Sequence, residues 1–167
     1  HAFIRTAYAR TDLQRNKLAE HLLTTDYTHL LMIDADHRHP YDIVERLSRW
    51  VVRDPGKQVI AGLAFRRGQP YDPQAYVLQD GRLAQPAEFK PGLAQVDYAG
   101  TAAMLIAREV FERLPKPWFA FDYRGAADGQ WPGEDIWFCE SCRQAGIKVW
   151  VDFTCVSPHL AESWINQ

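Results

Sequence analysis

Hydrophobic and polar positions follow helical and strand-like periods in turn along the chain. Apolar residues recur at helical spacing between Asp12 and Leu23, with polar residues between them, which predicts an amphipathic helix. Leu30 to Ile33 is a short continuous apolar run, as expected for a strand covered on both faces. The same reasoning predicts strands at 2–7, 59–64, 75–78, 82–84, 95–98, 104–106 and 147–151, and helices at 40–51, 108–114 and 134–145.

This order predicts a β-α-β-α chain with a β-rich insert in the middle. Alternating strands and helices are typical of an α/β sandwich around a mostly parallel central sheet. A chain of 167 residues suits one domain, and we expect residues 1–167 to share a single core.

Charge and composition exclude several classes of protein. Lys and Arg number 19 and Asp and Glu 21, so the net charge is 19 − 21 = −2, which gives nucleic-acid binding no support. The longest apolar run, Ala102 to Ala107, is far too short for a transmembrane segment. Three cysteines make no disulfide framework, so we expect a reducing, cytoplasmic location.

Two carboxylates follow the apolar run at 30–33, at Asp34 and Asp36. Open α/β sheets bind ligands where their strands end. In extended chain, residues two apart point to one face, and a divalent cation would offset the repulsion between the two charges. The alternative is that one Asp caps the next helix and the other is solvated. The pattern after a buried strand favours a cation-binding pair.

A second acidic pair, Glu134 and Asp135, opens the predicted helix at 134–145. Acids are common in a first helical turn because the helix dipole stabilises them. An aromatic, Gly-bearing segment precedes this pair, and such loops commonly close over a substrate. A carboxylate here could accept a proton from an attacking hydroxyl, and the dipole and a metal would keep its pKa low.

Other metal-capable and aromatic residues have simpler alternatives. His37 and His39 could complete a zinc cluster with the Asp pair, but they fit loop positions before Pro40 better. Cys139 and Cys142 lie within the last predicted helix, where core thiols are the better interpretation. Four aromatic residues could stack on an acceptor sugar or form a small core beneath a loop: Trp118, Phe119, Phe121 and Trp131.

Four stretches, taken in order, resemble metal-dependent glycosyltransferases of the GT-A fold, family 2 type. His29 to Pro40 is similar to the Asp-x-Asp strand and the Pro-started helix after it. Val59 to Arg66 resembles the next strand with its basic exit, and Asp97 to Ile106 resembles the Gly-bearing strand beside the donor sugar. Glu134 to Val151 resembles the Glu-Asp helix and its following strand, and His159 matches a late metal-binding His.

The resemblance implies a GT-A-like α/β/α sandwich, and a metal site that binds the donor. Asp36 and His159 would bind Mn²⁺ or Mg²⁺, which holds the diphosphate of a nucleotide-sugar donor. Asp34 would face the ribose or the metal. Gly100 would let the backbone approach the donor sugar, and Arg15 would retain part of the nucleotide pocket.

The resemblance also implies an inverting transfer to a carbohydrate or other hydroxyl acceptor. Asp135 would be the general base, supported by Glu134. Only 33 residues precede Asp34, so we expect a domain with a shortened N-terminal part and a reduced pocket for the base. Two alternatives stay open: a non-catalytic relative that binds nucleotide sugars or carbohydrates, and a metal-dependent phosphoester hydrolase.

Overall fold

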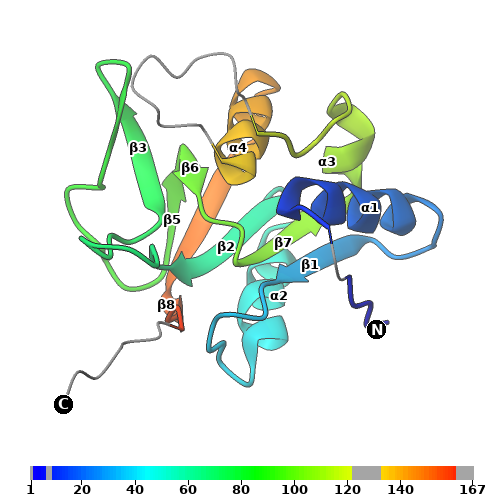
Figure 1. Ribbon diagram of the computed structural model, residues 1–167, viewed down its shortest axis with the longest axis horizontal. Helices are drawn as coiled ribbons and strands as arrows, with labels where there is room; N and C mark the ends of the chain where they lie inside the picture. Colours follow the sequence, from blue (N-terminus) through cyan, green and yellow to red (C-terminus); the bar gives the residue numbers. More distant parts are fainter. Residues whose placement is uncertain (1, 7–8, 122–132, 161–167) are drawn as a thin grey trace.

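The computed structural model describes residues 2–6, 9–121 and 133–160. Helices and strands follow one another along the chain as shown in Figure 1. The elements are α1 (Thr11–Leu23), β1 (His29–Ile33), α2 (Ile43–Arg53), β2 (Val59–Ala64), β3 (Ala75–Gln79), β4 (Arg82–Ala84), β5 (Leu93–Val96), β6 (Tyr98–Ala99), β7 (Ala103–Ala107), α3 (Arg108–Arg113), α4 (Glu134–Gln144) and β8 (Val149–Ser157).

The strands form two sheets. The larger sheet has 5 strands in the order β1-β7-β2-β8-β5, and the smaller has 3 strands in the order β4-β3-β6. In the larger sheet β2 and β8 are parallel, whereas the pairs β1–β7, β2–β7 and β5–β8 are antiparallel. Both pairs of the smaller sheet are antiparallel.

The prediction of a GT-A-like sandwich with a mostly parallel central sheet is therefore wrong. The structure is a mixed α/β fold whose larger sheet holds one parallel pair. The error has a physical cause: β7 is apolar along its whole length because it lies inside the sheet and is buried throughout. A strand covered on both faces is continuously apolar whichever way it runs, so its pattern does not encode its direction.

Side chains of β7 alternate between two hydrophobic clusters on opposite faces of the larger sheet. Met104 and Ile106 join the cluster that contains residues of α1, α3 and α4, whereas Ala103 and Leu105 join the cluster that contains residues of α2. Figure 1 shows α2 apart from the other three helices. The helices therefore cover both faces of this sheet.

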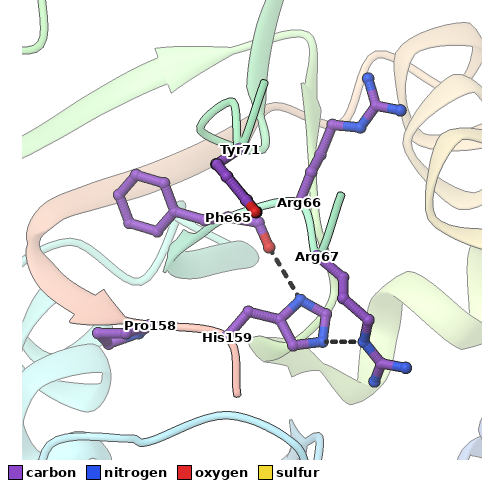
Figure 2. Close-up of a pocket in the computed structure, with 6 residues that line it drawn as sticks. All are labelled: Phe65, Arg66, Arg67, Tyr71, Pro158 and His159. Atoms are coloured by element: carbon purple, nitrogen blue, oxygen red, sulfur yellow. Dashed lines mark hydrogen bonds between the residues drawn. The ribbon is translucent and has the colours of Figure 1, made fainter. Parts of the chain in front are cut away.

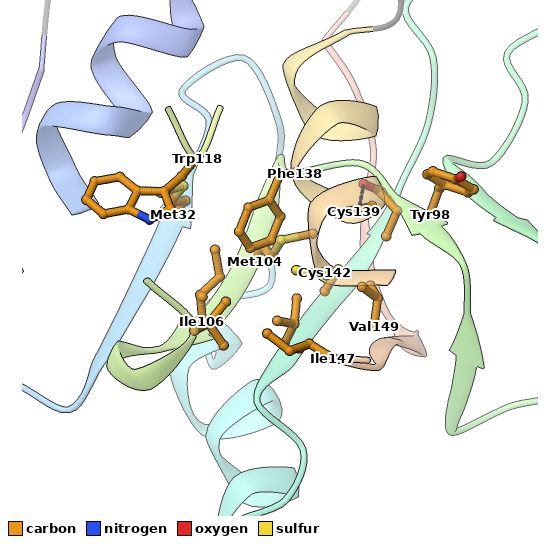
Figure 3. Packing of buried hydrophobic residues seen from close by; sticks show 14 of the residues in the cluster. Met32, Tyr98, Met104, Ile106, Trp118, Phe138, Cys139, Cys142, Ile147 and Val149 are labelled. Carbon is orange, nitrogen blue, oxygen red and sulfur yellow. Dashed lines mark hydrogen bonds between the residues drawn. The ribbon is translucent and has the colours of Figure 1, made fainter. Parts of the chain in front are cut away.

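Cys139 and Cys142 lie in the larger cluster and not at a metal site. Both are free and fully buried on the inner face of α4 (Figure 3). Phe138 packs there as well, stacked on Phe119 with ring centroids 4.7 Å apart. The interpretation of these two cysteines as core thiols is confirmed.

Some element bounds differ from the predicted ones. Residues 2–6 form no strand, and α2 begins at Ile43, after Pro40 and not at it. β8 extends to Ser157, well beyond the strand predicted at 147–151. Within the described part of the chain, no helix combines the length and the apolar character needed to cross a membrane.

Candidate functional site

A short backbone ladder joins the segment after β1 to the segment after β8. His37 and His159 form an antiparallel bridge. The Arg38 N–H donates to the Pro158 carbonyl at 2.9 Å, and the Leu160 N–H donates to the Asp36 carbonyl at 2.8 Å. This ladder brings His159 beside Asp36.

Asp36, His37 and His159 each place one metal-capable atom within 4.8 Å of the other two. Asp36 Oδ2 lies 3.2 Å from His159 Nε2, and Asp36 Oδ1 lies 2.9 Å from His37 Nδ1. The two imidazole rings stack, with centroids 4.1 Å apart. We call these three residues the Asp36 cluster.

The backbone fixes the tautomer of His159. Its Nδ1 lies 3.1 Å from the Phe65 carbonyl oxygen, which can only accept, so Nδ1 carries the proton. Arg67 Nε donates to His159 Nε2 at 3.1 Å, so Nε2 presents a lone pair. An imidazole that donates one N–H to a carbonyl and offers its other nitrogen is the usual state of a metal-binding histidine.

His37 is a third potential donor of the cluster. Its side chain is 4% exposed, and among the described residues its Nε2 has no hydrogen-bond partner. Burial lowers the pKa of His37 below its ordinary value, although Asp36 opposes this effect. The ring is therefore neutral at neutral pH, as a metal ligand must be.

His39 has a different role. Its Nε2 lies 2.8 Å from the Asp34 carbonyl oxygen, and its Nδ1 lies 2.9 Å from Ser157 Oγ. Both ring nitrogens are thus occupied in tying the end of β1 to the end of β8. His39 fits a structural role and not the zinc cluster considered from the sequence.

The carboxylate of Asp34 forms an ion pair with Arg15. Arg15 Nη2 donates to both of its oxygens, at 3.1 and 3.0 Å, and Arg15 Nε donates to Glu134 Oε1 at 3.2 Å. The chain turns at residues 35 and 36, so the two Asp side chains do not share one face of an extended strand. The expectation that both carboxylates flank one cation is not met in this arrangement.

Arg15 is buried, with 6% of its side chain exposed, and it connects α1 to the end of β1 and the start of α4. Its guanidinium contacts both carboxylates and the Thr101 carbonyl, and a part in a nucleotide pocket stays a prediction. The structure therefore gives Arg15 the role of positioning Asp34 and Glu134.

Asp135 differs from Glu134 beside it. Burial raises the pKa of Asp135 to about 6, the charge of Glu134 adds to this effect, and Arg15 opposes it. The prediction of a low pKa is wrong, because desolvation outweighs the favourable helix terminus. A carboxylate with this pKa is a stronger base than an ordinary Asp, which suits a general base near neutral pH.

The space beside Gly100 is filled by protein. A Cβ built on Gly100 would lie 2.6 Å from the side-chain oxygen of Gln74, and the Gly100 N–H donates to the Gln74 carbonyl at 2.9 Å. Gly100 therefore allows close packing of Gln74 in the described structure, and an approach to a donor sugar there stays a prediction.

Of the aromatic residues considered for stacking on an acceptor, Trp118 and Phe119 are core residues. The guanidinium of Arg10 lies over the ring of Phe121, and the Arg10 Cζ is 5.6 Å from the ring centroid. Trp131 lies outside the described residues.

A pocket of about 190 Å³ adjoins the Asp36 cluster (Figure 2). Its lining residues are Phe65, Arg66, Arg67, Tyr71, Pro158 and His159. Sequence reasoning did not identify Arg67 as a site residue. The signal that could have identified it was the pair of arginines one residue beyond the buried strand β2, at the same edge of the sheet as His159.

Comparison with known proteins identifies a structural likeness and no family. The chain matches no protein-family profile, and no curated protein is significantly similar to it in sequence. The structure is similar to the crystal structure of the viral protein A197 from STIV, with a TM-score of 0.64 and 18% sequence identity. The match covers 93% of this chain and 70% of that chain. At this identity the likeness concerns the fold alone.

Proposed function

We propose that this protein is a metal-dependent glycosyltransferase that moves a sugar from a nucleotide-diphosphate sugar to an acceptor hydroxyl. The observation that carries the proposal is the 3.2 Å approach of Asp36 Oδ2 to His159 Nε2, in a tautomer of His159 that offers a lone pair. The order of the four stretches that resemble this class of enzyme also supports it.

The donor set of the Asp36 cluster fits a divalent cation. One carboxylate and two imidazoles are a mixed oxygen and nitrogen set, which suits Mn²⁺ better than Mg²⁺, because Mg²⁺ prefers oxygen ligands throughout. Asp36 and His159 would hold the cation, with His37 as a further donor. When bound, such a cation offsets the charge that develops on a departing nucleoside diphosphate.

Asp135 is the residue we assign to accept the proton of the acceptor hydroxyl. Its raised pKa suits this role, whereas Glu134 is held by Arg15. Arg15 also holds Asp34, so a single buried guanidinium links the start of α4 to the segment that carries Asp36. An inverting transfer needs one such base, on the side of the acceptor.

The test is an assay of transfer with a panel of uridine and guanosine diphosphate sugars, Mn²⁺ and simple sugar acceptors, followed by mass spectrometry. We expect EDTA to abolish transfer, and Asp36→Asn to reduce it at least about 100-fold. Asp135→Asn should keep Mn²⁺ and donor binding while reducing transfer on the order of 100-fold. The matched control is Asp26→Asn, because Asp26 is exposed outside the site.

The alternatives predict different results in this assay and in a phosphatase assay. A non-catalytic binder would bind the donor with Mn²⁺ but release no nucleoside diphosphate. A phosphoester hydrolase would cleave 4-nitrophenyl phosphate in an Asp36-dependent manner and transfer no sugar. Either result would contradict the proposed transfer.

A further inference from the structure

The guanidinium of Arg67 lies against the two atoms that we assign to a divalent cation. Its Nη2 donates to Asp36 Oδ2 in a short charged hydrogen bond, and its Nε donates to His159 Nε2 at 3.1 Å. Asp36 Oδ2 is the same oxygen that approaches His159 Nε2. One side chain of this protein therefore contacts both candidate ligand atoms at once.

The chemistry of these atoms explains the contact. A carboxylate oxygen and an imidazole nitrogen with a free lone pair are both electron-rich, and at 3.2 Å they repel each other unless a cation is near. Arg67 supplies that positive charge from within the chain. A divalent cation would need the same lone pair of His159 and the same oxygen of Asp36, so it and the Arg67 guanidinium exclude each other.

A displaced Arg67 side chain can move into the adjacent pocket. The side chain is 63% exposed, and both Arg66 and Arg67 line the pocket beside His159. Figure 2 shows the two arginine side chains running in opposite directions, with only Arg67 reaching His159. Guanidinium groups bind phosphates with paired hydrogen bonds. At about 190 Å³ the pocket is smaller than a site for a whole drug-sized ligand, so it suits phosphates and not a complete nucleotide.

We propose that Arg67 is an exchangeable cation: a divalent metal displaces it from Asp36 and His159, and the freed guanidinium then binds the phosphates of an anionic ligand in the adjacent pocket. The inference rests on the proposed metal site and adds a coupling to it. Because the metal frees a phosphate-binding group, metal and phosphate ligand strengthen each other's binding, and by linkage the effect is reciprocal.

The test separates the two halves of the exchange with one substitution, Arg67→Gln. Calorimetry with Mn²⁺ alone should show tighter binding to Arg67→Gln than to the unmodified protein, by a factor of about 5 to 150, because the internal competitor is gone. Calorimetry with uridine diphosphate at saturating Mn²⁺ should show weaker binding to the variant, by about tenfold or more. Arg82→Gln is the matched control, an exposed arginine in β4.

Calorimetry of Asp36→Asn with Mn²⁺ shows whether the metal binds through Asp36. This measurement distinguishes failure of this inference from failure of the proposed function. If the unmodified protein binds Mn²⁺ through Asp36 but Arg67→Gln binds it no more tightly, the exchange is refuted and the metal site stands. If neither the unmodified protein nor Arg67→Gln binds Mn²⁺, the metal site itself is refuted. Weaker Mn²⁺ binding by Arg67→Gln would also overturn the inference, because it would make Arg67 a supporting residue and not a competitor.

Discussion

His159 Nε2 lies 3.2 Å from Asp36 Oδ2, although the two residues are 123 positions apart in sequence. The contact depends on the ladder between residues 36–38 and 158–160, and the Phe65 carbonyl fixes the orientation of the His159 ring. Three segments of the chain therefore have to be in register before the two atoms meet. This makes the pair sensitive to changes in β2 and β8, as well as to changes in its own residues.

The two carboxylates of the Asp-x-Asp segment should respond differently to removal of their charge. Asp36→Asn should abolish Mn²⁺ binding and change the free energy of unfolding by less than about 1 kcal/mol, because the side chain is 45% exposed. Asp34→Asn should keep Mn²⁺ binding but lower the free energy of unfolding by about 1–3 kcal/mol, because buried Arg15 loses one of its two carboxylates.

Urea unfolding and calorimetry with Mn²⁺ measure these two effects, with Asp26→Asn as the exposed control. Loss of Mn²⁺ binding in Asp34→Asn would show that Asp34 leaves Arg15 and joins the metal site. Retention of Mn²⁺ binding in Asp36→Asn would remove Asp36 from that site.

The ionised form of Asp135 should cost stability at neutral pH. Its pKa is raised from an ordinary 3.8 to about 6 in the folded protein, chiefly by burial. Between these values the folded protein binds the proton more tightly than the unfolded chain does. The contribution of this carboxyl to stability is therefore complete below about pH 4 and is lost as the pH rises through 6.

Asp135→Asn removes this ionisation. The change that it makes in the free energy of unfolding should therefore be more favourable at pH 7.5 than at pH 4.5, by roughly 1–3 kcal/mol. Denaturant unfolding at both pH values measures the difference. Glu134→Gln is the control from the same helical turn, and it should destabilise at pH 7.5 because Arg15 loses a partner. The same effect of Asp135→Asn at both pH values would contradict the raised pKa.

Local pattern predicted individual elements well, and it failed where pairing between distant segments decides the structure. The helix α1 and the strand β2 were predicted almost to the residue, because their periodicity and their flanking residues are local signals. The direction of β7 was not predicted, because an apolar run buried on both faces fits either direction. The sheet was therefore expected to be mostly parallel when it holds one parallel pair.

The residues of the candidate site also fall into those that a local pattern marks and those that only the fold brings together. The carboxylates at the end of β1 are visible in the sequence, because a charged pair directly after an apolar strand is a local signal. The turn at residues 35 and 36 is not visible in the sequence. It directs Asp34 to Arg15 and Asp36 to the histidines. The arginines at 66 and 67 mark a basic segment in the sequence, but only the folded chain places Arg67 and the Phe65 carbonyl against His159.

All three thiols should be unreactive in the folded protein. Cys139, Cys142 and Cys155 are fully buried, and burial raises the pKa of Cys139 to about 12 and that of Cys155 to about 11. The thiolate is the reactive form, so neither access nor ionisation favours modification. Reaction with Ellman's reagent at pH 8 should follow unfolding in urea, and rapid modification without denaturant would contradict the described core.

Gly62 should be required for the approach of His159 to Asp36. The register between β2 and β8 shifts directly after Gly62, which pairs with Asp152 while Leu63 pairs with Val156. A Cβ on Gly62 would lie 2.8 Å from the Cys155 carbonyl oxygen, which is a backbone atom and cannot swing away. Gly62→Ala must therefore move the irregular part of β8, from which the chain continues to His159.

We expect Gly62→Ala to lower the free energy of unfolding by about 1–3 kcal/mol, the usual cost of overpacking a buried site, and to weaken Mn²⁺ binding at the same time. Gly68→Ala is the matched control, because a Cβ there meets no atom within 4 Å. Urea unfolding and Mn²⁺ calorimetry on both variants measure the two effects. If Gly62→Ala loses stability but binds Mn²⁺ as tightly as Gly68→Ala does, the irregularity in β8 does not position His159, and the ladder at residues 36–38 holds it alone.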